Sequence, residues 1–149
     1  MLVSVINSTK NNCNQFVSTN KSHLKYIYLI VGGSIGTVLR FLTSSWILEA
    51  YPGSKFPWGT FFINLLGSFI IGILAGINQS SEFSLNLRLF LFAGILGGFT
   101  TYSGYAIETF QLIKSNNFGL AGVYILSTTL LGLILAGIGF WLSTFATGK

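Results

Sequence analysis

The chain has 149 residues, and its only charged side chains are 8 Lys or Arg and 3 Asp or Glu. They make up 7% of the sequence, against roughly 25% in a soluble globular domain, and the mean hydropathy is +0.69. So few polar groups cannot cover the surface of a water-soluble domain, which excludes a soluble enzyme and predicts a membrane protein.

The first 23 residues form a polar segment rich in Asn, Ser and Thr. The segment has no long apolar stretch and no small-residue cleavage site, so it does not resemble a signal peptide. We expect a tail over residues 1–23 that is disordered at least in part, followed by a membrane domain over residues 24–149. Cys13, the only cysteine, excludes a disulfide within the chain.

The remaining sequence predicts four membrane-spanning helices. Residues 56–81, 89–107 and 115–148 contain no charged side chain, and about 20 apolar residues suffice to cross the hydrocarbon core. The expected fold is therefore an all-α membrane protein, with spans at Leu24–Leu48, Trp58–Asn78, Leu87–Leu112 and Phe118–Phe145.

The distribution of positive charge predicts an orientation. With four spans, both chain ends and the second loop lie on one side of the membrane, and that side carries five cations: Lys10, Lys21, Lys25, Arg88 and Lys149. The other side carries Lys55 and Lys114. This bias favours a cytoplasmic N-terminus in the inner (plasma) membrane. Because the cations are scattered singly, no basic patch indicates nucleic-acid binding.

Spaced glycines predict close helix packing. Gly32 and Gly36 in the first span, like Gly72 and Gly76 in the second, form small-xxx-small pairs that let helix backbones approach closely. Packing within one chain and packing between two chains are both compatible with these pairs.

Two polar side chains interrupt the first two spans. Arg40 either extends to the membrane interface or lies at the mouth of an anion path. Asn64 is followed by continuous apolar sequence, and its amide needs hydrogen-bonding partners. It is predicted either to line a pore or to form hydrogen bonds with a neighbouring helix.

The third span contains the strongest signal for a functional site. Residues 94–105 place glycines beside Thr100, Thr101 and Ser103 at membrane depth. Glycine disfavours the helix interior, so we predict a break in this span. Irregular backbone in a membrane is tolerated where it is buried in protein or lines a wet cavity, although a simple packing notch is the alternative.

Aromatic and hydroxyl residues follow this predicted break. Tyr102 and Tyr105 lie three residues apart, and their ring edges suit an anion, although such a pair is also common in packing. Glu108 is interpreted as extending the same face. In the fourth span Ser127 and Thr128 are weaker candidates, because hydroxyls often bond carbonyls of their own helix.

Three stretches of this sequence together resemble the Fluc (CrcB) family of fluoride channels. They are GGSIGTVLRF at residues 32–41, GTFFIN at residues 59–64 and GGFTTYS at residues 97–103. Their order and spacing and the four-span length match over residues 26–145.

The resemblance implies an antiparallel, dual-topology dimer with two pores that export fluoride passively. It further implies a Na⁺ ion at the dimer interface, held by the backbone carbonyls of Gly97 and Thr100. Asn64 matches the pore-lining asparagine of the family and Arg40 its arginine, near a vestibule. The pore phenylalanines correspond to Tyr102 and Tyr105. Ser103 belongs to the hydroxyl row, and Glu108 matches the glutamate of the third helix.

The sequence departs from the family pattern at three positions: Tyr102 and Tyr105 replace phenylalanines, and Gly104 stands where Ser or Thr is usual. Because some members of the family pair two different chains, a homodimer and a heterodimer both remain open, as does a non-conducting or partner-dependent subunit. Small multidrug transporters share the four-span architecture, but they need a carboxylate in the first span, and this one has none before Glu49. Fluoride and membrane lipid are the expected partners.

Overall fold

The computed structural model describes the backbone of residues 2–148 and the side chains of residues 23–148. Within this part of the chain every regular element is helical. The elements are α1 (Leu2–Ala50), α2 (Trp58–Ser80), α3 (Leu85–Arg88), the π-helix η1 (Leu89–Leu96), α4 (Gly97–Phe99), α5 (Tyr102–Lys114) and α6 (Phe118–Ala146).

Four helical stretches are long and apolar enough to cross a membrane: His23–Ala50, Trp58–Ser80, Leu85–Lys114 and Phe118–Ala146. The expectation of an all-helical, multi-pass membrane protein is therefore confirmed, and each span ends within two residues of its predicted boundary. The charge-free runs predict the spans well because the hydrocarbon core excludes charge over a fixed thickness.

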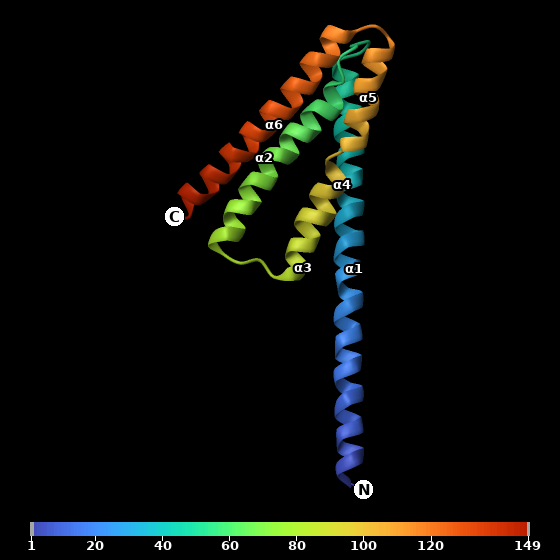
Figure 1. The fold of residues 1–149 in the computed structure, drawn as a ribbon, viewed down its shortest axis with the longest axis vertical. Helices are drawn as coiled ribbons and strands as arrows, with labels where there is room; N and C mark the ends of the chain where they lie inside the picture. Colours follow the sequence, from blue (N-terminus) through green and yellow to red (C-terminus); the bar gives the residue numbers. More distant parts are fainter. Residues whose placement is uncertain (1, 149) are drawn as a thin grey trace.

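The structure differs from the sequence-based expectation at the N-terminal end. Helix α1 continues through residues 2–22, where we expected a partly disordered tail, and it extends far beyond the other helices (Figure 1). No glycine or proline occurs before Gly32, so nothing interrupts a helix that the first span has already nucleated. The apolar part of α1 begins at His23; the division into two domains at this point stays a prediction.

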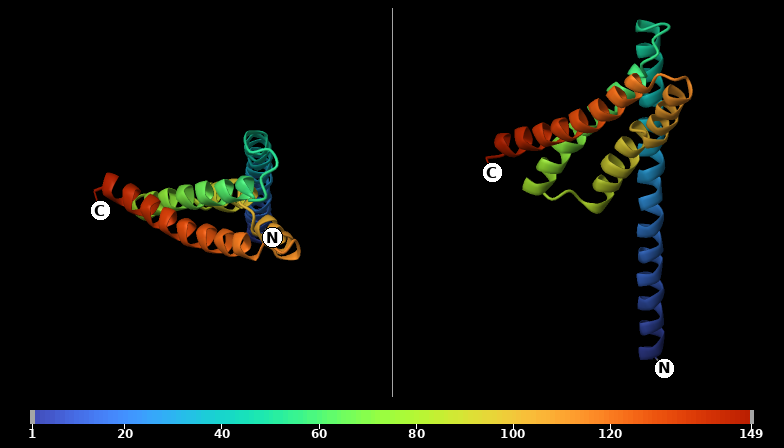
Figure 2. Two further views of the ribbon diagram at one scale, coloured as in Figure 1. Left: turned by 90° about the horizontal axis from the view of Figure 1, so that it is seen from above. Right: turned by 45° about the horizontal axis from the view of Figure 1, so that its top comes forward.

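The helices form two packed groups that diverge from one end of the molecule. Helix α2 packs most extensively on α6, whereas α1 packs on η1 and α4. Figures 1 and 2 show α2 and α6 running side by side, at an angle to α1 and the third span. The groups meet where the α1–α2 and α5–α6 connections lie.

The spaced glycines allow both close helix contacts. A Cβ atom added at Gly36 would overlap the carbonyl of Ile95 in η1, and one at Gly72 would overlap the carbonyl of Ala136 in α6. A Cβ at Gly32 would lie 2.6 Å from the carbonyl oxygen of Phe90. These glycine faces are therefore filled by neighbouring helices of the same chain.

The third span leaves the helical conformation at two threonines. Thr100 (φ −78°, ψ 157°) and Thr101 (φ −147°, ψ 113°) are extended, whereas Gly97 and Gly98 stay in α4. The Thr101 hydroxyl accepts a hydrogen bond from the Gly104 N–H at 3.0 Å, which is the usual way for a threonine to cap a helix. Helix α5 thus begins in the middle of the third span.

Glycines on the same helix provide a test of this packing. A Cβ at Gly139 would overlap the carbonyl of Phe69, whereas one at Gly137 would have no neighbour within 4 Å in the chain. We expect Gly139→Ala to destabilise the purified protein by about 1–3 kcal/mol through overpacking, and Gly137→Ala to leave it unchanged or stabilise it. Thermal unfolding in detergent measures both variants, and equal melting temperatures would contradict the packing described.

Candidate functional site

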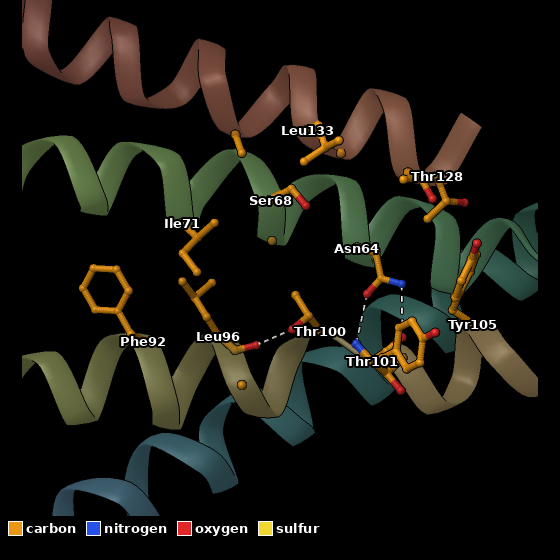
Figure 3. Close-up of a pocket in the computed structure, with 16 residues that line it drawn as sticks. Asn64, Ser68, Ile71, Phe92, Leu96, Thr100, Thr101, Tyr105, Thr128 and Leu133 are labelled. Atoms are coloured by element: carbon orange, nitrogen blue, oxygen red, sulfur yellow. Dashed lines mark hydrogen bonds between the residues drawn. The ribbon is translucent and has the colours of Figure 1, made fainter. Parts of the chain in front are cut away.

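A cavity of about 520 Å³ lies between α2, the third span and α6 (Figure 3). Of the predicted site residues, it brings together Asn64, Tyr102, Tyr105 and Thr128, and it includes Gly97 and Thr100 at the break. None of the described residues that line this cavity carries a charge at neutral pH. The other polar lining residues are Ser68, Thr101 and Thr129.

Asn64 fixes the backbone of the break. Its Oδ1 atom accepts a hydrogen bond from the Thr101 N–H at 2.9 Å, and its Nδ2 donates to the Thr101 carbonyl oxygen at 3.1 Å; Figure 3 shows both bonds. An asparagine amide has two N–H donors, so one remains. Asn64 therefore lines the cavity and bonds between helices, and the two interpretations of this residue are compatible.

The same break deprives the four backbone carbonyls of residues 97–100 of their usual helical donors, and Gly97 O and Thr100 O are two of them. In a continuous helix, Gly97 O would accept from the N–H of Thr101, and Thr100 O from that of Gly104. Here these two N–H groups donate to the Asn64 side chain and to the Thr101 hydroxyl instead. These are the two carbonyls that the resemblance assigns to a cation, and neutral oxygens of this kind suit a hard monovalent ion.

Acidic and sulfur ligands do not gather at any point in residues 23–148. No group of three or more His, Cys, Asp or Glu side chains is close enough there to hold a metal ion. A cation at the break would therefore depend on backbone carbonyls.

The two tyrosines after the break occupy different surroundings. Their ring centroids are 5.8 Å apart, but Tyr102 is 81% exposed in the single chain. The ring of Tyr105 packs on the fully buried Tyr124 of α6, with a centroid distance of 5.2 Å. Both tyrosines line this chain's own cavity, but Tyr105 is packed against α6, whereas most of Tyr102 is exposed.

Glu108 does not extend the face of the tyrosines into this cavity. Its carboxylate accepts hydrogen bonds from the Thr60 hydroxyl at 2.7 Å and from the Tyr124 hydroxyl at 2.8 Å. It lines a second cavity, of about 240 Å³, beneath the α1–α2 connection. From Tyr102 to Glu108 a helix turns about 120° short of two full turns, so these two side chains point to different sides of α5.

Three other predicted residues lie outside the cavity. Ser103 is exposed, and its hydroxyl lies 3.3 Å from that of Thr101. Ser127 bonds the Tyr124 carbonyl of its own helix at 3.5 Å, as the sequence analysis allowed. Arg40 is half-buried on α1 and lines neither cavity. In the single chain these three side chains are not assembled with Asn64.

Sequence reasoning missed two residues of α2, Thr60 and Ser68. Both lie four residues from Asn64, and residues four apart share one helix face. Thr60 bonds Glu108 and Ser68 lines the main cavity. The i, i+4, i+8 spacing of polar residues in an otherwise apolar span was the signal that could have identified them.

Comparisons of this sequence with known proteins identify a family. The profile described as "CrcB-like protein, Camphor Resistance (CrcB)" matches residues 27–140. A fluoride-specific ion channel FluC from Parabacteroides distasonis is 40% identical over 78% of this chain and 90% of its own length. A protein of the same name from Thermus thermophilus is 38% identical over 83% of this chain and 97% of its own length.

The chain belongs to the CrcB family. Its CrcB region contains every predicted site residue, from Arg40 to Thr128, and begins after the polar N-terminal segment. A third relative, from Anaeromyxobacter dehalogenans, is 42% identical over 71% of this chain and 84% of its own length and is also named a fluoride-specific ion channel. Membership in a family of ion channels confirms the expectation that this chain is not an enzyme.

The hydroxyls around Glu108 provide a test of the second cavity. Thr60→Val removes a hydrogen bond to a carboxylate, so we expect a loss of about 1.5–3 kcal/mol in unfolding free energy. Thr109→Val is the matched control, because the Thr109 hydroxyl bonds only the Tyr105 carbonyl of its own helix, at 2.7 Å. Thermal unfolding in detergent compares the two variants. Similar losses of unfolding free energy would show that the hydrogen bond from Thr60 to Glu108 does not stabilise the protein.

Proposed function

We propose that this chain forms a fluoride channel that exports fluoride passively and so lowers its cytoplasmic concentration. The observation that carries the proposal is the cavity around Asn64, whose described lining offers neutral amide and hydroxyl groups and no charged side chain. The names of the curated relatives, which this chain matches over most of their length, support the same function. Passive export places the channel in the inner (plasma) membrane.

Neutral hydrogen-bond donors suit the transport of fluoride. Fluoride is small and strongly hydrated, so a pore must replace the water that the ion sheds. We infer that the remaining N–H of Asn64 and the hydroxyl of Thr128 replace part of this water. The ion then passes the rings of Tyr105 and Tyr102, whose edges are electropositive.

The predicted residues outside the cavity would act at the two ends of the path. Arg40, which lies deeper inside a predicted span than any other cation, would attract anions to a vestibule. Ser103, Ser127 and Glu108 lie beyond the cavity wall. In this proposal the hydroxyls of Ser103 and Ser127 contact fluoride as it enters or leaves, whereas the Glu108 carboxylate stays bonded to Thr60 and Tyr124.

We further propose that the functional unit is an antiparallel, dual-topology dimer. Tyr102 lines the cavity of its own chain but is 81% exposed there, so in a dimer it would also contact the partner. The carbonyls of Gly97 and Thr100 would hold a structural Na⁺ ion at the interface, where the ion would fix the relative position of the two breaks. Both carbonyls lack their helical donors, which supports this assignment.

The partner can be a second copy or a homologous chain. An antiparallel dimer of identical chains requires the chain to insert into the membrane in both orientations. The excess of cations on the N-terminal side favours only one of these orientations. This bias supports, as a second candidate, a subunit that conducts only with a homologous partner.

Asn64→Asp tests the path. The variant keeps an acceptor for the Thr101 N–H but sets a carboxylate oxygen against the Thr101 carbonyl and introduces negative charge into the cavity. We expect fluoride efflux from proteoliposomes, measured with a fluoride electrode, to be abolished. Asn78→Asp is the matched control: it lies outside this cavity, and its Oδ1 accepts a hydrogen bond from the Phe83 N–H that an aspartate retains. Unchanged fluoride efflux in Asn64→Asp would show that Asn64 does not line the ion path.

Reconstitution of the chain alone tests the pairing. We expect purified chain in liposomes to release fluoride, and addition of a homologous chain not to be required. Efflux that appears only after a homologous chain is added would establish the heterodimer. The absence of fluoride efflux in every pairing would contradict the proposed function itself.

A further inference from the structure

A third cavity, of about 540 Å³, lies between the end of α2 and the beginning of the third span. The connection of residues 81–84 joins these two helix ends, where the two helix groups diverge most (Figure 1). Arg88 is the only charged residue of the described lining, and Asn78 is the only other polar one. The remaining five lining residues are apolar: Ala75, Leu85, Leu89, Phe92 and Ala93.

This cavity begins at the depth of the membrane surface. The second span, Trp58–Ser80, ends two residues after Asn78, and the third, Leu85–Lys114, begins three residues before Arg88. Beyond Arg88, the cavity wall continues along η1 toward the middle of the third span. The cavity therefore has a cationic end at the membrane surface and an apolar end in the hydrocarbon core.

The Arg88 guanidinium has no partner in the part of the chain described. Within residues 23–148 it forms no ion pair, and no carboxylate is among the described lining residues. Glu82, in the adjacent connection, is exposed and lies outside the cavity lining. The Asn78 Oδ1 atom accepts a hydrogen bond from the Phe83 N–H at 3.1 Å and so holds the connection in place. Arg88 is thus left with its N–H donors free for a ligand.

The apolar wall of this cavity is formed by an irregular helix. Residues Leu89–Leu96 form a π-helix, a conformation that is rare in proteins and frequent at functional sites. The π-helix begins directly after Arg88 and supplies three of the apolar lining residues. Its Phe90 ring packs edge-on to Tyr28 of α1, with a centroid distance of 6.3 Å. The wall is therefore supported by α1, whereas its other face is open to the cavity.

These two ends favour an anionic phospholipid as the occupant. The planar fork of an arginine binds two oxygen atoms of one phosphate, and such charge-assisted hydrogen bonds are strong. An acyl chain suits an apolar wall that continues into the hydrocarbon, whereas a free phosphate ion would match Arg88 alone. Basic pockets between membrane helices are sites where anionic headgroups bind.

We propose that Arg88 binds the phosphate of an anionic phospholipid whose acyl chain lies against Leu89 and Phe92. The site lies on the same side of the membrane as the N-terminus. Phe92 lines this cavity and the main one, and Figure 3 shows its side chain directed from η1 toward α2. The bound lipid would therefore fill the space between α2 and the third span up to the wall of the main cavity.

Lipid binding to the purified chain in a neutral detergent tests this site, because orientation in a membrane then has no effect. The probes are dioleoyl phosphatidylglycerol and dioleoyl phosphatidylcholine, which share their acyl chains and differ in net charge. Native mass spectrometry measures the bound lipid. We expect the unaltered protein to prefer phosphatidylglycerol, and Arg88→Gln to bind it about tenfold more weakly, as for the loss of hydrogen bonds to a charged group. Arg88→Lys should bind with intermediate affinity, because lysine keeps the charge and loses the fork.

Matched variants separate this site from general attraction to the protein. Lys114→Gln removes a cation at the other end of the same span, outside this cavity, and should bind phosphatidylglycerol like the unaltered protein. Leu85→Gln places a polar side chain in the cavity wall and should weaken binding several-fold. Leu87→Gln changes a leucine of the same short helix that lies outside the lining, and it should have no effect.

Three outcomes would overturn the lipid site. Equal weakening by Arg88→Gln and Lys114→Gln would show that overall charge holds the lipid. Displacement of phosphatidylglycerol by an equal concentration of inorganic phosphate would show that the acyl chain contributes nothing. Conversion of a dimer to a monomer by Arg88→Gln, measured by light scattering, would show that a second copy occupies the cavity. None of these measurements involves fluoride, so this inference and the proposed channel function are tested separately.

Discussion

The pair of hydrogen bonds between Asn64 and the backbone of Thr101 is the contact on which the rest of the site depends. It gives an acceptor to the Thr101 N–H, which the interrupted helix leaves open, and adds a second donor to the Thr101 carbonyl, the N-cap carbonyl of α5. It also joins α2 to the third span and fixes where α5 begins. The carbonyls of Gly97 and Thr100, the cap of α5 and the position of Tyr105 all follow from this one interaction.

A second constraint is the division of polar groups between two cavities. The rings of Tyr105 and Tyr124 pack together between the neutral cavity around Asn64 and the carboxylate of Glu108. The charge of Glu108 is balanced by hydroxyl donors from α2 and α6 and kept away from the proposed anion site. Negative charge beside that site would repel the ion, so the separation is a requirement of the proposed function as well as a feature of the packing.

The sequence predicts the spans closely because membrane thickness and the exclusion of charge act on each segment separately. Glycine and threonine in the third span disfavour a continuous helix through local effects, so irregular backbone can also be expected there from the sequence. It does not predict that Asn64 bonds Thr101, because that choice depends on how α2 and the third span approach each other. Nor does local composition predict that Glu108 lines the second cavity in the single chain or that α1 continues through residues 2–22.

The composition of the cavity lining bears on how the protein would respond to acid. Hydroxyl and amide groups keep their protons throughout the range from about pH 5 to 8 in which histidine titrates, and no charged or histidine side chain is among the described lining residues. The donors offered to an anion are therefore the same in neutral and acidified cytoplasm. Within the described lining, the wall of this cavity thus contains no carboxylate, amine or imidazole to respond to acid stress.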